Sequence, residues 1–139
     1  MRLLVIGGRH LDDVALIRRS LNAALKRHPV EVLIHGGHAV LGATSEEIAR
    51  DHGLHIVRYP ANWRRHGQAA ESIRNRFMLA DSRPDIALAL PGGEDTLAFV
   101  QHLRAAGVTV LDPDALACAA QPQPSRPPSW AVTLRPNLT

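Results

Sequence analysis

The 139-residue sequence has one cysteine, few aromatic residues and no long apolar run. A single cysteine, Cys118, excludes an internal disulfide and a cysteine-based zinc site, which is typical of a reducing compartment. The opening stretch MRLLVIGG is too short for the apolar core of a signal peptide, and no apolar run approaches the length of a membrane span. We therefore expect a cytoplasmic protein without a membrane partner.

A strong charge of one sign is also missing. The formal net charge is +3, from 16 Lys and Arg against 13 Asp and Glu. A nucleic-acid-binding chain more often carries a basic block or stripe, whereas the densest arginine cluster here, within residues 58–76, is interrupted by apolar residues. We expect this arginine cluster to line a site for an anionic small molecule, and we do not expect a nucleic-acid partner.

Short apolar runs alternate with helical patterns as far as residue 111. Apolar strands separated by helices are typical of a parallel sheet that is buried on both faces. The sequence therefore predicts an α/β fold, with a doubly wound parallel sheet of about five strands, helices on both faces and strand order 3-2-1-4-5. Strands are predicted at residues 3–6, 30–34, 55–57, 85–90 and 108–111, and helices at 12–27, 44–51, 68–80 and 95–106.

The chain changes character after Asp112. The following segment is rich in proline, and we interpret residues 121–129 as a linker or an extended arm. Trp130, Val132 and Leu134 alternate with polar or small residues, so this strip could dock as an edge strand on the same subunit or a neighbour. We expect one folded domain over residues 1–112, a Pro-rich extension over 113–139, and a homodimer or larger homo-oligomer.

Three predicted strands end in glycine loops, GGRH at 7–10, HGGH at 35–38 and PGGED at 91–95. In an open parallel sheet, ligands bind beyond the carboxyl ends of the strands, where the strand order reverses. Glycine lets a ligand approach the backbone there and exposes N–H groups to an oxyanion. We therefore predict that the loops converge on one ligand site. Its predicted members are Gly7, Gly8, Arg9, Gly36, Gly37, His38, Gly92 and Gly93.

Glu94 and Asp95 are unexpected in a loop that holds a phosphate. One interpretation is structural, with an N-cap and a first-turn acid that each contribute under about 1 kcal/mol to helix stability. The other is that the two carboxylates accept hydrogen bonds from ribose hydroxyls, while the N–H groups of Gly92 and Gly93 face another part of the ligand. The two interpretations are compatible. With carboxylates beside free N–H groups, the loop favours a nucleotide with an exposed ribose over a bare phosphate.

Other side chains near the predicted site have simpler interpretations. His10, His35 and His38 could bind zinc, but their spacing matches no metal signature, and we expect neither a metal nor a cofactor. Trp63 could stack on a base, although a buried anchor for its loop is the favoured interpretation. We expect Phe77 and Met78 in the core.

Several motifs in order resemble the SLOG superfamily, Rossmann-like domains that bind nucleotides and nucleotide-derived ligands. The stretch IRNRFMLADSRPDIALALPGGEDT resembles the Arg-rich helix and the PGGxGTxxE motif of the LOG lysine-decarboxylase-like enzymes. VIGGR, IHGG, YPANW followed by HGQAA, and IRN with Met78 three residues after Asn75 are more similar to the YspA-related branch. The resemblance covers about residues 1–111. It implies that Arg74, Asn75 and Thr96 also contact the ligand.

The chain departs from these motifs at positions that bear on chemistry. GGHAVLGAT stands where the YspA-related branch has GGARGAD, and Asp95 replaces the last glycine of PGGxGT. Arg74 matches the catalytic arginine of the LOG enzymes, but Phe99 stands where they carry a glutamate that serves the hydrolysis of a nucleoside 5′-monophosphate. An arginine alone cannot stabilise an oxocarbenium-like state or activate water.

The resemblance therefore favours a binding protein, which senses or sequesters a nucleotide-derived, ADP-ribose-like ligand. The alternative is a hydrolase or transferase that acts on the N-glycosidic bond of a nucleotide. In that case the catalytic candidates are Arg74 together with Glu94, Asp95 or Glu71 in place of the lost carboxylate. A third possibility, a DNA-associated protein like a related branch of the superfamily, is disfavoured by the mild charge and the scarcity of aromatic residues.

Overall fold

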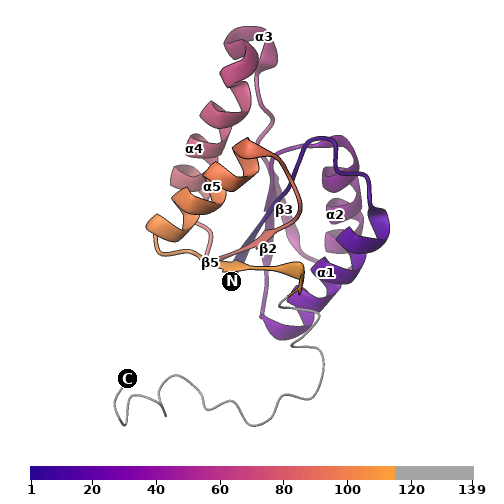
Figure 1. Ribbon diagram of the computed structural model, residues 1–139. Coiled ribbons are helices and arrows are strands. Elements are labelled where there is room, and N and C mark those ends of the chain that lie inside the picture. The colour runs from indigo at the N-terminus through magenta and orange to yellow at the C-terminus, as the bar shows by residue number, and fades with distance from the viewer. Residues whose placement is uncertain (115–139) are drawn as a thin grey trace, which may run out of the picture.

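The computed structural model describes residues 1–114. They form a five-stranded, all-parallel sheet with strand order β3-β2-β1-β4-β5, covered by helices on both faces (Figure 1). The predicted Rossmann-like, doubly wound α/β fold and its strand order are confirmed. The predictions for Cys118, for residues 121–129 and for the strip that begins at Trp130 lie outside the described residues, and the domain boundary at 112 stays a prediction.

Strands and helices alternate along the described chain, and none of its helices is long and apolar enough to cross a membrane. The cytoplasmic location stays a prediction. In order, the elements are β1 (Arg2–Ile6), α1 (Val14–Arg27), β2 (Val32–His35), α2 (Ala39–Asp51), β3 (His55–Arg58), α3 (Trp63–His66), the 3-10 helix η1 (Gly67–Ala69), α4 (Ala70–Ser82), β4 (Ile86–Ala89), α5 (Glu94–Ala105) and β5 (Thr109–Leu111).

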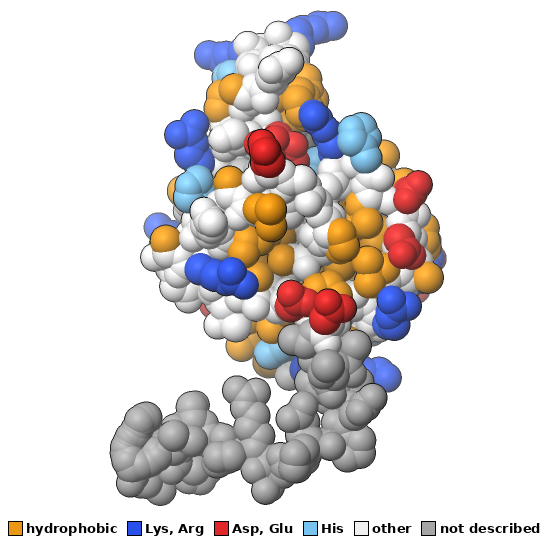
Figure 2. Space-filling view, in the orientation of Figure 1, with side chains coloured by type: hydrophobic (Ala, Val, Ile, Leu, Met, Phe, Trp, Pro, Cys, Tyr) orange, Lys and Arg blue, Asp and Glu red, His pale blue; other side chains and the backbone are white. Residues whose placement is uncertain are grey.

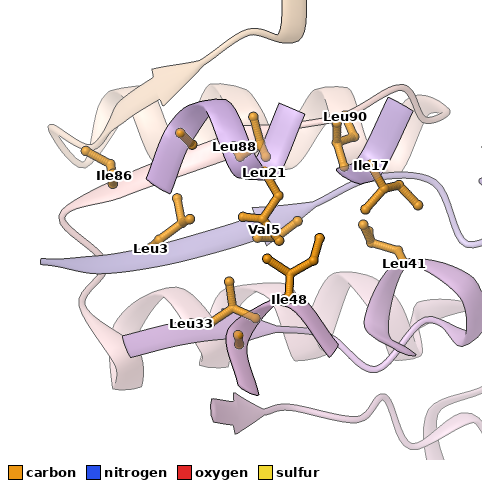
Figure 3. Close-up of a cluster of buried hydrophobic side chains, with 12 residues drawn as sticks. Leu3, Val5, Ile17, Leu21, Leu33, Leu41, Ile48, Ile86, Leu88 and Leu90 are labelled. Atoms are coloured by element: carbon orange, nitrogen blue, oxygen red, sulfur yellow. The ribbon is translucent and has the colours of Figure 1, made fainter. Parts of the chain in front are cut away.

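The sheet buries apolar side chains on both faces. On β1, Leu3 and Val5 pack into a cluster with residues of α1 and α2, while Leu4 belongs to the opposite cluster with residues of α4 and α5. Figure 3 shows the first cluster, in which Ile17 of α1 and Leu41 of α2 lie close to the sheet. Since successive side chains of a strand point to opposite faces, burial on both faces produces the continuous apolar runs of the sequence.

Two helix starts differ from those predicted. α2 begins at Ala39, five residues before the predicted start at Thr44. The sequence does not indicate this start, because the residue before it, His38, makes no side-chain cap bond and is not a typical N-cap residue. Gly42 lies inside α2, where a Cβ would come within 3.1 Å of the His35 ring. The predicted helix from residue 68 begins at Ala70, after α3 and η1.

Two aromatic side chains lie at the surface, contrary to the predictions. Phe77 is 60% exposed, and its ring contacts that of Tyr59 edge-on at a centroid distance of 5.8 Å. Trp63 is 42% exposed on α3, which projects beyond the sheet (Figure 1). The helical pattern cannot separate Phe77 from its neighbour Met78, which is buried as predicted.

Candidate functional site

The loops after β1 and β4 meet at the centre of the sheet. β1 and β4 are neighbours in the sheet. The strand order reverses between them, because β2 and β3 lie on one side of β1 whereas β4 and β5 lie on the other. The N–H of Gly8 donates to the carbonyl of Pro91 at 2.9 Å. A Cβ on Gly8 would lie 3.0 Å from Cα of Gly92, and a Cβ on Gly92 would lie 2.7 Å from the Gly8 nitrogen. The two loops can therefore touch only as glycine backbones.

An open cleft of about 610 Å³ lies at this contact. It is lined by residues 8–12 and 91–96 and by Glu71 of α4. Acidic side chains outnumber basic ones in the lining, and Figure 2 shows acidic side chains over the start of α5 with basic and histidine side chains beside them. The acidic lining residues are Asp12, Glu71, Glu94 and Asp95, and the basic ones are Arg9 and His10.

The structure brings together two of the three loops that the sequence predicted to converge. From the predicted ligand set, the cleft lining includes Gly8, Arg9, Gly92, Gly93, Glu94, Asp95 and Thr96. The HGGH loop lies apart, and Gly37 and His38 line a separate pocket of about 330 Å³. Among the hydrogen bonds of residues 1–114, one joins the HGGH loop to the cleft lining. In it, Nε2 of His38 donates to Oε2 of Glu71 at 3.1 Å.

The remaining predicted residues lie behind the cleft. Gly7 is buried, and a Cβ there would meet Leu41, Leu11 and Leu90 at 3.1–3.3 Å. Gly36 lies against the guanidinium of Arg74. Asn75 is buried and accepts a hydrogen bond at Oδ1 from Nε of Arg74, 2.7 Å away.

Arg74 is 7% exposed and is bound to backbone carbonyls. Its Nη1 donates to the carbonyl of Gly36 and, at 3.1 Å, to that of Tyr59. Burial lowers the pKa of Arg74, and the carboxylate of Glu71, 3.5 Å from Nη2, opposes that shift. The side chain therefore ties the loops after β2 and β3 to α4.

The arginine cluster within residues 58–76 does not line the large cleft. That it lines a site for an anionic small molecule stays a prediction. Arg58 and Arg74 line a smaller pocket of about 260 Å³ beside Phe77. Arg64, Arg65 and Arg76 are exposed. The arginine in the cleft lining is Arg9. The sequence pattern could not show which of these arginines point toward a pocket, because they are distributed over β3, α3 and α4.

The three histidines considered for zinc do not gather into one group. Among residues 1–114, no three His, Cys, Asp or Glu side chains are placed to hold a metal ion. His35 is buried against α2, whereas His10 lines the cleft. The Nδ1 of His35 accepts from the N–H of Gly37 at 3.0 Å, so its proton is on Nε2, which donates to Glu46 at 2.6 Å. His35 therefore serves to shape the HGGH loop.

Comparison with known proteins identifies the amino-terminal part of the chain. Residues 1–66 match the sequence model described as YAcAr, the YspA, cpYpsA-related SLOG family. Over this segment the chain is similar to the YspA-related SLOG family. The match agrees with the resemblance drawn from the motifs, and it supports nucleotide-related binding or activity at a general level. No curated protein matches the chain.

The SLOG match includes the GGRH and HGGH loops and Trp63, but the other wall of the cleft lies beyond it. Sequence reasoning missed that Asp12 lines the cleft, because an acid before a helix is explained by the helix dipole. It also missed a contact at the cleft edge, where Cζ of Arg9 lies 4.9 Å from the centroid of the Trp63 ring. Such a cation–π contact orients Arg9, a member of the lining.

Acidification is expected to destabilise the fold through His35, which is buried, and His38, which is half-buried. Burial lowers the pKa of both His35 and His38 from 6.5. Below pH 6.5 the unfolded chain thus binds more protons than the folded chain, so the stabilisation present above that pH is lost as the pH falls toward the lowered values. In urea titrations, the stability difference between the wild type and His35→Gln should shrink from pH 7 to pH 5. A difference that grows on acidification would contradict the assigned tautomer.

Proposed function

We propose that the protein binds a nucleotide-derived ligand of the ADP-ribose type in the 610 Å³ cleft, as a sensor or a sequestering module. The observation that carries this proposal is the position of the cleft. It lies where the loops after β1 and β4 meet through the Gly8–Pro91 hydrogen bond, at the point where the strand order reverses. Ligands of parallel α/β sheets bind at such positions. The family match over residues 1–66 supports a nucleotide-related ligand in general.

The chemistry of the lining supports a ligand with both phosphates and sugars. The first N–H groups of α5, at Glu94 and Asp95, have no partner within the helix and can donate to a phosphate oxygen. Arg9 adds one positive charge. The carboxylates of the lining would repel additional phosphates and can accept hydrogen bonds from hydroxyl groups. A volume of about 610 Å³ also lies within the range of about 300–1,000 Å³ that is typical of small-molecule sites.

Arg9→Gln should weaken the binding of ADP-ribose by about tenfold or more, because a hydrogen bond to a charged group contributes about 1.5–3 kcal/mol. Calorimetric titration of the wild type and the variant measures this effect. Arg19→Gln is the matched control, since Arg19 is an exposed residue of α1 outside the cleft lining. Equal weakening by both variants would indicate a general charge effect and would contradict the proposed contact.

A second candidate function is hydrolysis of the ligand at an N-glycosidic bond. Phe99 is 3% exposed and packs in the core with Met78 and Leu103, so position 99 supplies no group to the cleft. Glu71 favours this candidate, because it is a buried carboxylate in the cleft lining. Chromatography of the titration mixtures separates the two functions. A binding protein leaves AMP and ADP-ribose intact, whereas release of base or ribose 5-phosphate above background would establish hydrolysis.

The predicted homodimer or larger homo-oligomer remains a proposal. Phe77 and Leu97 are large apolar side chains that lie exposed on α4 and α5, and exposed apolar surface is often covered in an assembly. Light scattering on the full-length chain distinguishes an oligomer from a monomer.

A further inference from the structure

Glu71 differs from the other carboxylates of the cleft in its burial. Asp12, Glu94 and Asp95 are exposed, whereas Glu71 is only 4% exposed, although it also belongs to the cleft lining. It lies in the first turn of α4, on the helix that packs beside α5. A carboxylate is seldom buried unless other groups hold it in place.

One oxygen of Glu71 is held by two side chains. Oε2 accepts a hydrogen bond from Nε2 of His38 at 3.1 Å and lies 3.5 Å from Nη2 of Arg74. Arg74 is itself fixed, since it is bound to the backbone carbonyls of Gly36 and Tyr59. The position of the carboxylate is therefore set before a ligand arrives.

The other oxygen of Glu71 is available to a ligand. Within residues 1–114, Oε1 accepts no side-chain hydrogen bond, and the sole enclosed side-chain N or O atom without a partner is Oγ of Ser45. Oε1 is therefore not fully enclosed, and the cleft is the described pocket that Glu71 lines. An ionised carboxylate only accepts hydrogen bonds, so its partner on a ligand must be a donor.

We infer that Glu71 binds the terminal ribose of an ADP-ribose-type ligand, and that this contact selects ligands with a free sugar at the end of the diphosphate. This inference rests on the proposed function and adds an orientation to it. The terminal ribose, whose hydroxyl groups are donors, lies in the cleft against Oε1 of Glu71. The diphosphate lies toward Arg9 and the start of α5, where the positive charge and the free N–H groups are located. A bare phosphate at Glu71 would instead meet a buried negative charge.

Comparison of ADP-ribose with ADP in the wild type and in Glu71→Gln tests this contact, because ADP lacks the terminal ribose and ends instead in a phosphate that carries one more negative charge. We expect calorimetry to show at least tenfold tighter binding of ADP-ribose than of ADP to the wild type. A site built to bond hydroxyl groups strongly disfavours a ligand without them. In Glu71→Gln, the affinity for ADP-ribose should fall by about tenfold or more while that for ADP stays within about twofold, so that the preference is lost.

Glu31→Gln is the matched control, because it also removes one negative charge and its side chain is 81% exposed at the opposite end of the sheet. It should keep the wild-type preference. Equal loss of both ligands in Glu71→Gln would assign Glu71 a structural role and overturn the inference, as would a wild type that binds ADP and ADP-ribose equally. The last result would leave the proposed function intact. A wild type that binds neither ligand would instead overturn the proposed function. If Glu71→Gln does not fold, Glu71→Asp replaces it, because aspartate keeps the charge and withdraws the carboxylate by one methylene group; an unchanged preference in that variant would overturn the inference.

Discussion

Replacement of Arg74 by alanine is expected to lower the free energy of unfolding by about 3 kcal/mol. The guanidinium donates to the carbonyls of Gly36 and Tyr59 and lies beside the carboxylate of Glu71. Its removal would leave these groups without their partner in a place that water enters poorly, and the desolvation cost of each group would remain. The midpoint and slope of a urea denaturation curve measure the change.

Arg76→Ala is the matched control for Arg74→Ala. Arg76 lies two residues further along α4 and is exposed, so its removal should change the free energy of unfolding by less than about 0.5 kcal/mol. If Arg74→Ala unfolds at the same urea concentration as the wild type, Arg74 does not connect the loops as the structure indicates. A ligand contact by Arg74, which the family resemblance implies, stays a prediction and has to be measured against this loss of stability.

Replacement of Phe99 by glutamate is expected to cost at least about 4 kcal/mol or to prevent folding. Phe99 is buried between α5 and the sheet, with Ile6, Met78 and Leu103 in the same cluster. The substitution removes a packed aromatic ring, which costs about 3–5 kcal/mol by itself. It also places an ionisable group in an apolar environment that offers no partner. Thermal unfolding followed by circular dichroism measures the loss.

Gln101→Glu tests whether the effect belongs to position 99. Gln101 lies on the same helix and is exposed, so a glutamate there should leave the melting temperature nearly unchanged. A Phe99→Glu variant as stable as Gln101→Glu would contradict the packing described. The position at which the LOG enzymes carry a glutamate thus belongs, in this chain, to the core. A gain of hydrolysis from Phe99→Glu is therefore not expected.

The sheet and its glycine loops could be predicted from the sequence because burial on both faces leaves a strong signal. Runs such as Leu3–Ile6 and Ile86–Ala89 are apolar at every position, and helical patterns separate them. Right-handed crossovers then restrict the topology. The meeting of the GGRH and PGGED loops follows from the adjacency of β1 and β4.

The direction of individual side chains could not be predicted in the same way. Arg74 and Glu71 are three residues apart on α4, and helical spacing indicates only that they share a face. Whether that face meets the cleft or the backbone of a neighbouring loop depends on the path of the chain after β2 and β3. His35 positions the loop after β2 through its contacts with Gly37 and Glu46, and such contacts leave no pattern in the sequence.

Hydrogen exchange with and without ADP-ribose tests the central claim, ligand binding in the cleft, most directly. If the ligand lies there, its presence should slow the exchange of backbone N–H groups in residues 8–12 and 92–97, which belong to the cleft lining and the first turn of α5. Exchange at the amino ends of the strands, such as Val32 and Thr109, should not change. Protection confined to residues 58–77, around the pocket lined by Arg58 and Phe77, or no protection at saturating ligand, would contradict the account.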